Sequence, residues 1–295
     1  MIVELPYIKD GIMHATIRKH RFHLRRKDPT PDNFLWIDGR ILLVLDTVAA
    51  DFVSFILQGM WQFQQGLGDD SEKVRQFVVE RMHRKYSGRL GWPARRITPE
   101  RLRSDLDRIF GTIMGIAEGA CPVDSNLAMK EIDINRWIAP ARMDLALTYR
   151  CNLNCAHCYA AAAAGKEIPE LTTSQWKQVL ERLWKIGVPN VVFTGGEPTL
   201  REDLVELVDA AKLFVTGLVT NGTQLTKLAR PLQEASLDYV QVTLESPVSE
   251  VHNGMVSASF DAFNRTVEGI TAGLEAGIQV ITNTTLTRQN AMQFP

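Results

Sequence analysis

The second half of the chain, from about residue 141, alternates between two hydrophobic patterns. Short apolar runs typical of buried strands are separated by segments in which apolar residues recur every three or four positions, as on one face of a helix. The five runs are MDLALTYRC, NVVFTGGEP, VTGLVTNG, YVQVTLES and IQVITNTTL. Five strands and four helices in strict alternation predict a parallel α/β unit, and we expect a partial (β/α) barrel of the TIM type.

Two of these helices carry signals at their ends. Thr172 and Gln175 have the spacing of a capping box at the start of the first helix. The last helix is expected to stop at Gly277. Its buried face should consist of Phe263, Val267, Ile270 and Leu274. Because the sequence reaches Pro295 just after the fifth strand, we expect the barrel domain to be truncated at its C-terminus.

The first 120 residues have a different pattern, with the strands ahead of the helices. Residues 2–8 and 14–26 fit two paired strands, and RILLVLD at 40–46 fits a third. This order predicts a small α+β domain of winged-helix-like type.

Three helices are predicted after those strands. Asp46 should cap the first, which is expected to end near Gly59, and the second carries Val74 on its inner face. Thr98 as N-cap and Pro99 at the first helical position begin the third. The predicted organisation has three parts: a winged-helix-like domain at 1–120, a connector at 121–140 and a barrel domain at 141–295.

Composition narrows the class of protein without deciding its function. The chain is 45% hydrophobic and 23% charged, with a net charge of −1, which is typical of a folded domain and gives no argument for a nucleic-acid or membrane partner. No apolar stretch approaches the ~18 residues of a membrane helix, and the N-terminus lacks the pattern of a signal peptide. We therefore expect a cytoplasmic protein.

Three of the four cysteines lie close together, with the spacing C-x3-C-x2-C. They are Cys151, Cys155 and Cys158, directly after the first strand of the α/β unit. Three thiolates can hold a [4Fe–4S] cluster and leave one iron open for another ligand. Two alternatives stay open at this point: a zinc site with His157 as fourth ligand, and cysteines that bind no metal.

Three further motifs end successive predicted strands. TGGEP covers 194–198, TNGT covers 220–223 and TLES covers 243–246. Glycines at a strand end let backbone polar groups approach a ligand closely. Together with the cysteine motif and the adjacent Tyr159, these motifs resemble those of the radical S-adenosylmethionine (radical SAM) superfamily, over roughly 142–290.

The resemblance implies two cofactors, a [4Fe–4S] cluster and S-adenosylmethionine, and a 5′-deoxyadenosyl radical that abstracts hydrogen from a substrate. It makes Cys151, Cys155 and Cys158 the cluster ligands and leaves the catalytic side chains unassigned. The residues that it assigns to cofactor binding are His157, Gly195, Gly196, Glu197, Asn221, Thr223 and Glu245.

The resemblance also suggests individual roles. In relatives an aromatic residue at the position of His157 lies against the adenine, and a carboxylate at the position of Glu197 lies near the methionine ammonium. Thr223 would bond the ribose or the carboxylate of the cofactor. Thr243 and Glu245 stand where relatives often have Ser and Asp, so a role carried over to Glu245 rests on a weaker match.

The order of elements in residues 1–120 is similar to that of the precursor-peptide recognition element of ribosomal peptide (RiPP) maturases. In that family the leader of a precursor peptide adds as a strand to a sheet edge and rests against a helix. The resemblance implies that RILLVLD receives the leader and that the third helix, around 102–113, is the far wall. It also implies an electron donor such as a flavodoxin or ferredoxin.

Other interpretations remain. The basic stretch RKHRFHLRR at 18–26 would suit an RNA substrate, although a solvated hairpin explains the charges equally well. A small molecule such as a porphyrin is a further possible substrate. The chain would otherwise be a truncated cluster-binding fragment without full activity.

Overall fold

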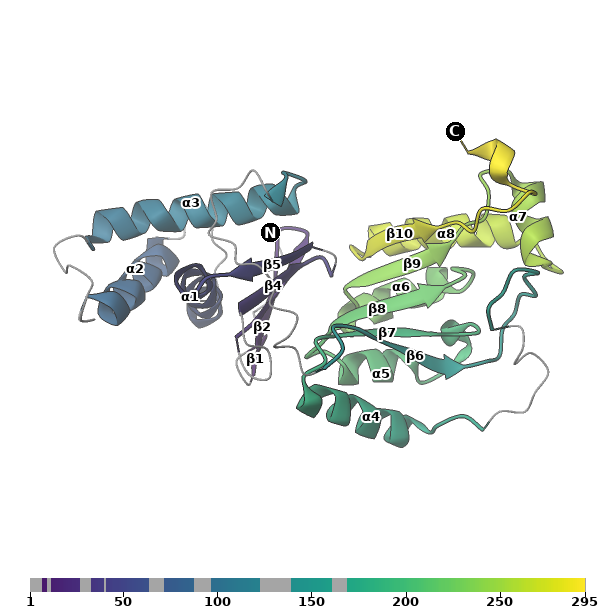
Figure 1. Ribbon diagram of the computed structural model, residues 1–295, viewed down its shortest axis with the longest axis horizontal. Helices are drawn as coiled ribbons and strands as arrows, with labels where there is room; N and C mark the ends of the chain where they lie inside the picture. Colours follow the sequence, from purple (N-terminus) through teal and green to yellow (C-terminus); the bar gives the residue numbers. More distant parts are fainter. Residues whose placement is uncertain are drawn as a thin grey trace. The chain divides into compact units, whose positions relative to one another are not determined.

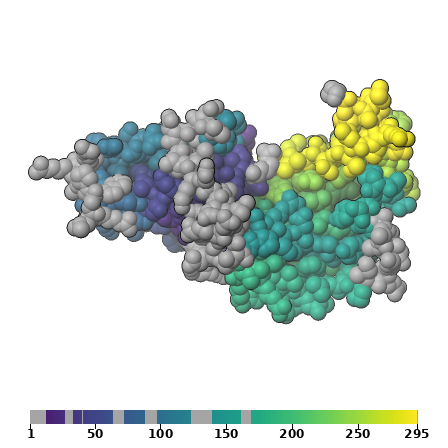
Figure 2. Space-filling model, in the orientation of Figure 1, coloured from purple at the N-terminus to yellow at the C-terminus, as the bar shows by residue number. Residues whose placement is uncertain are grey.

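The computed structural model describes residues 7–9, 12–26, 33–39, 41–63, 72–87, 97–122, 139–160 and 169–294. The chain folds as two compact units, Met1–Ile138 and Ala139–Pro295, shown as a ribbon in Figure 1 and as a surface in Figure 2. Most of the predicted connector lies outside the described residues. Among the helices that the structure describes, none is long and apolar enough to cross a membrane.

The first unit begins with an antiparallel sheet whose strands follow one another in sequence order. Its strands are β1 (Tyr7–Lys9), β2 (Ile12–Ile17), β3 (His20–Arg25), β4 (Asn33–Ile37) and β5 (Ile41–Leu45). The α+β class is confirmed, and β5 forms an outer edge of this sheet. Residues 2–6 of the first predicted strand lie outside the described part of the chain.

Two details of this sheet differ from the prediction. The segment 14–26 belongs to two strands joined by a turn, because Arg18 adopts a positive φ of 59° that its sequence does not signal. The strand β4 was not predicted, because nearly all of its residues are buried and it lacks the alternation of a half-buried strand.

Three helices follow the sheet: α1 (Thr47–Phe63), α2 (Glu72–Tyr86) and α3 (Pro99–Ala117). The predicted caps are confirmed, since Ala49 N donates to Asp46 Oδ1 at 2.7 Å and Arg101 N donates to Thr98 Oγ1. The predicted end of α1 near Gly59 is wrong. A Cβ on Gly59 would lie 3.0 Å from Cδ1 of Phe77, so this glycine allows α1 and α2 to pack closely.

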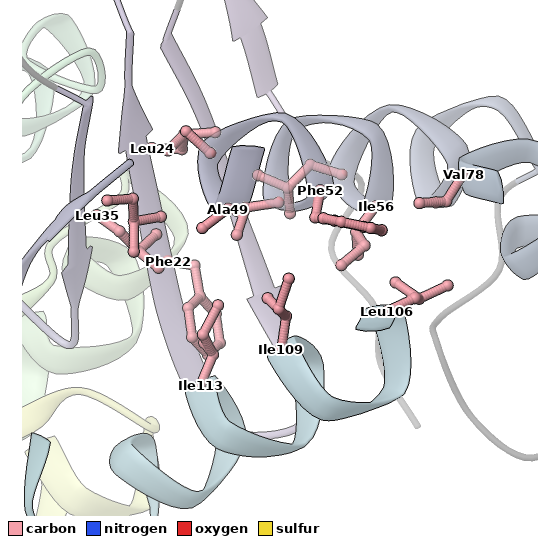
Figure 3. Packing of buried hydrophobic residues seen from close by; sticks show 14 of the residues in the cluster. Phe22, Leu24, Leu35, Ala49, Phe52, Ile56, Val78, Leu106, Ile109 and Ile113 are labelled. Carbon is pink, nitrogen blue, oxygen red and sulfur yellow. The ribbon is translucent and has the colours of Figure 1, made fainter. Parts of the chain in front are cut away.

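The core of the first unit lies between the sheet and the three helices (Figure 3). Residues that meet there from the sheet, α1 and α3 include Phe22, Leu24, Leu35, Phe52, Ile56, Ile109 and Ile113. The inner face of α3 is therefore used by the core itself.

A buried carboxylate ties β3, α1 and α2 together beside this core. Asp51 is fully buried and contacts Arg26, Lys85 and Tyr86 at 2.5–2.6 Å. Burial alone would raise the pKa of Asp51, but Lys85, Tyr86 and Arg26 outweigh it and hold that pKa below its usual value.

The second unit contains the predicted parallel sheet, and its strand order is β10-β9-β8-β7-β6. Its strands are β6 (Met143–Thr148), β7 (Asn190–Gly195), β8 (Val215–Thr220), β9 (Tyr239–Thr243) and β10 (Gln279–Asn283). The helices are α4 (Thr173–Ile186), α5 (Leu204–Ala210), α6 (Leu225–Glu234), α7 (Ser249–Val256) and α8 (Ala262–Glu275). The capping box of Thr172 and Gln175 is confirmed at the start of α4.

The helix α8 packs mainly through small residues, and its predicted inner face is only partly confirmed, since Phe263 and Ile270 are half-buried. Its buried residues are Ala262, Thr266, Gly269 and Gly273. Val267 and Leu274, predicted to be inside, are 38% and 58% exposed. The reason is close packing, because a Cβ on Gly269 would lie 2.1 Å from the carbonyl oxygen of Gly222. The short helix α7 was not predicted, since it is too brief for a clear period.

We predict that Gly269→Ala destabilises the second unit. The added Cβ would push α8 away from the turn at Gly222, at a cost of roughly 1–3 kcal/mol. Urea unfolding followed by circular dichroism measures the change. Gly254→Ala in α7 is the matched control, because a Cβ there would meet no heavy atom within 4 Å. Equal losses of stability in both variants would contradict this packing account.

Candidate active site

A cavity of about 250 Å³ opens at the C-terminal ends of the parallel strands. The loop after β6, residues 149–160, contributes Cys151, Leu153, Cys155, His157, Cys158 and Tyr159. The other strand ends and α7 contribute Thr194, Gly195, Gly196, Val219, Thr220, Asn221, Gln241, Thr243, Glu245, Val256, Asn283 and Thr285. Ligand sites in parallel α/β folds collect at this end of the strands.

The structure gathers most of the predicted site residues in this cavity. The three cysteines line it together with His157, Gly195, Gly196, Asn221 and Glu245. Glu197 and Thr223 do not line the cavity. Both are hydrogen bonded to Asn221, which does. Their roles in binding a cofactor stay predictions.

The cysteine loop is held by backbone hydrogen bonds. Asn154 N donates to the carbonyl oxygen of Val256 at 3.0 Å, which fastens the loop to the end of α7. Cys158 N donates to the carbonyl oxygen of Cys155 at 3.1 Å, which closes a turn. All the cysteines are free thiols.

The glycine pair at the end of β7 sets the distance between two strand ends. Gly195 has a φ of +140°, a conformation that glycine adopts without strain. Gly196 N donates to the carbonyl oxygen of Thr148 at 2.7 Å, and a Cβ on Gly196 would lie 2.4 Å from the carbonyl oxygen of Arg150. The backbone that leads into Cys151 therefore lies directly against these glycines.

Glu197 connects β7 to β8 from inside the protein. It is fully buried, and its carboxylate accepts hydrogen bonds from Thr220 Oγ1 at 2.7 Å, Asn221 N at 2.7 Å and Thr199 N at 3.0 Å. Burial raises the pKa of Glu197, while these hydrogen bonds act in the opposite direction. Both oxygens are engaged by the protein, so this residue organises the loop that carries Asn221.

Asn152 joins the cysteine loop to the loop after β8 and was missed from the sequence. Its Nδ2 donates to Thr223 Oγ1 at 2.9 Å, and its Oδ1 accepts from Asn221 Nδ2 at 2.8 Å. A single asparagine between two cysteines carries no pattern that signals such a contact. Gln241, Asn283 and Thr285, which line the cavity, were also missed, because no pattern in the sequence around them signals a site.

Glu245 is the second buried carboxylate of the site. Its Oε1 lies 2.8 Å from His157 Nε2, and its Oε2 accepts a hydrogen bond from Thr285 N at 2.8 Å. Its backbone N–H donates to His252 Nδ1 at 3.1 Å. The Nδ1 of His252 must therefore be unprotonated, which fixes this buried ring as the neutral Nε2–H tautomer.

The three thiols suit a metal cluster chemically. Burial raises the pKa of Cys155 to about 11, assisted by Cys151 and Cys158, and burial also raises the pKa of Cys151. Such thiols stay protonated near neutral pH unless a metal takes up the thiolate charge. Within the described residues no three possible ligands lie close enough together to bind a single metal ion. A [4Fe–4S] cluster does not require this, because each thiolate binds a different iron.

Fold and site together define a partial (β/α) barrel with a three-cysteine centre beside a glycine-lined cavity. Residues 145–293 match the radical SAM superfamily, and the chain belongs to that superfamily. The cofactors of this superfamily are a [4Fe–4S] cluster and S-adenosylmethionine, and we predict that Cys151, Cys155 and Cys158, which line the cavity together, hold the cluster.

Similar proteins act on different substrates. The chain is 36% identical to the Fe-coproporphyrin III synthase of Methanosarcina barkeri over 154 residues, which are 50% of this chain and 38% of that protein. It is 36% identical to the PqqA peptide cyclase of Bradyrhizobium diazoefficiens over 159 residues, or 53% and 42%. The chain thus spans about two fifths of the length of these relatives.

Among the solved structures that are similar over most of the chain is one with a bound peptide. It is SuiB of Streptococcus suis bound to its precursor peptide SuiA, with a TM-score of 0.48 and 16% identity, covering 89% of this chain and 55% of SuiB.

We predict that the second unit loses stability as the pH falls below about 6.5, in part through His252. Burial lowers the pKa of His252 from its ordinary 6.5, against the opposing effects of Glu245 and Asp261. Below pH 6.5 His252 therefore binds a proton in the unfolded chain but not in the folded chain. Each pH unit between its unfolded and folded pKa lowers the free energy of unfolding by at most about 1.4 kcal/mol.

Urea unfolding at pH 7.5 and 5.5 measures this effect. His252→Asn keeps an acceptor for Glu245 N but does not titrate, so it should show a smaller loss between the two pH values. The same loss in both proteins would rule out His252 as a source.

Proposed function

We propose that this chain cleaves S-adenosylmethionine reductively and uses the resulting radical to modify a ribosomally made precursor peptide. The observation that carries the peptide part is the free edge of β5, which in the described residues pairs with β4 alone. An edge strand presents unpaired N–H and C=O groups to which an extended peptide can add. On this proposal the first unit binds the leader and the second performs the chemistry.

The residues of the second unit have distinct tasks in this proposal. Cys151, Cys155 and Cys158 would hold the cluster. A cluster bound there would supply the electron for the reductive cleavage of S-adenosylmethionine. Gly195 and Gly196 keep the cavity wall free of side chains, and Asn221 presents an amide to it.

The structure agrees with only part of the peptide-binding groove that the sequence predicts between β5 and α3. Leu102, Leu106, Ile109 and Ile113 of α3 are buried in the core of the first unit, so these side chains are not available to a peptide. The far wall would come from the exposed residues of α3 instead. Affinity would then rest mainly on main-chain pairing with β5.

The basic stretch at 18–26 gives little support to an RNA substrate. His20, Arg21, His23 and Arg25 are all less than 9% exposed. Arg18 is exposed but paired with Glu118 at 2.5 Å. A nucleic-acid surface needs cations that phosphates can reach, so the structure of β3 favours the peptide proposal.

We predict that the chain, reconstituted with iron and sulfide without oxygen, forms 5′-deoxyadenosine from S-adenosylmethionine and a reductant. Cys155→Ala removes one cluster ligand and should abolish the nucleoside. Cys121→Ala, an exposed thiol of the first unit, is the matched control and should behave as wild type. Mass spectrometry measures the product. A folded wild-type protein that binds no iron would refute the proposed cluster site.

We predict that a short reading frame beside the gene of this chain encodes a peptide that slows amide hydrogen exchange in β5. The full chain is incubated with that peptide and analysed by mass spectrometry. Exchange at residues 41–45 should slow at least tenfold, because outward N–H groups gain partners, while β7 and β8 keep their rates. Coproporphyrin III at the same concentration should have no effect on β5. Peptide binding without protection of β5 would contradict the proposed binding mode.

A further inference from the structure

Glu245 connects four separate segments of the second unit through hydrogen bonds. It follows β9 and is completely buried. Its carboxylate contacts His157 in the cysteine loop and Thr285 after β10. Its backbone N–H donates to His252 of α7, and its carbonyl oxygen accepts from Asn290 Nδ2 at 2.7 Å.

The proton positions in this group follow from its chemistry. A carboxylate only accepts hydrogen bonds, and the Thr285 backbone N–H only donates. With Glu245 as a carboxylate, the hydrogen bond of 2.8 Å between them runs from Nε2–H of His157 to Oε1 of Glu245. Neither oxygen of Glu245 is left without a protein donor, so the residue does not need a cofactor to satisfy it.

The segment after β10 is itself held in place. Asn290 is fully buried, donates to the carbonyl oxygen of Thr285 at 3.0 Å and accepts from Thr287 N at 2.7 Å. Thr284 Oγ1 donates to the carbonyl oxygen of Leu244 at 2.6 Å. Figures 1 and 2 show this segment, in yellow, beside the teal cysteine loop. This segment therefore holds Glu245 through both its carboxylate and its backbone carbonyl.

We infer that Glu245 is a positioning residue that orders the cysteine loop by holding Nε2 of His157. His157 lies between Cys155 and Cys158, so fixing its ring fixes the backbone that separates these two sulfurs. The inference concerns the site of the proposed function but does not rest on the peptide substrate. It also differs from stacking of His157 on the adenine, because it requires the donor at Nε2 and not the aromatic face.

Substitutions of His157 separate the two roles. His157→Gln keeps an N–H donor near the position of Nε2, whereas His157→Asn places its donor near the position of Nδ1, too short to reach Glu245. His157→Phe keeps an aromatic face without a donor. The side chain is 21% exposed, so all three variants are expected to fold. Glu268→Gln, an exposed carboxylate on α8, is the control.

The first measurement uses the protein without cofactors. Hydrogen exchange at residues 150–158 should be at wild-type rates in His157→Gln and about tenfold faster in His157→Asn and His157→Phe, since a hydrogen bond to a charged group is lost. Exchange in residues 284–290 should rise in the same two variants, with β7 and β8 unchanged. Exchange at wild-type rates in all three variants, or slower exchange in His157→Phe than in His157→Gln, would overturn the inference.

The second measurement uses the cluster. After reconstitution without oxygen, iron content and the electron paramagnetic resonance signal of the reduced cluster should follow the same order, with His157→Gln close to wild type. Retention by His157→Phe with loss by His157→Gln would assign the ring to stacking and overturn the positioning role. If the wild type makes no 5′-deoxyadenosine while the exchange results hold, the proposed function fails and the positioning role of Glu245 stands.

Discussion

The active-site cavity depends on a contact between two strand ends that leaves no room for side chains. At the end of β7 the backbone of Gly195 and Gly196 lies against the carbonyl oxygens of Thr148 and Arg150, one residue before the first cysteine. A side chain at either glycine would overlap these oxygens. The direction in which the cysteine loop leaves the sheet is therefore set by backbone atoms, whose positions are far more restricted than those of side chains.

Buried polar groups extend this arrangement across the sheet. Glu197 fastens the loop after β8 to β7, Asn152 fastens the cysteine loop to Asn221, and Glu245 fastens it to the segment after β10. In a low-dielectric interior each such group needs its partners, because an unpaired buried carboxylate is costly. The two carboxylates therefore select one mutual arrangement of the strand ends.

The sequence predicted the elements whose signals are local. The capping box at Thr172, the strand-end glycines and the cysteine spacing each follow from adjacent residues, and the structure brings the strand-end motifs together. The predicted inner face of α8 was wrong at Val267 and Leu274, because close packing at Gly269 places small residues inward. Asn152 and Gln241 were missed because their roles arise only from contacts with distant segments.

The connections made by Glu245 also fix the order in which the protein can mature. The strands of the first unit pair with their neighbours along the chain, so it can fold while the rest is still being synthesised. The cysteines leave the ribosome early in the second unit, but their loop stays incomplete until Glu245 and Asn290 have followed. At ordinary translation speeds this delay is on the order of ten seconds. The hydrogen bonds that complete the cysteine loop can therefore form only after all five strands of the parallel sheet have been synthesised.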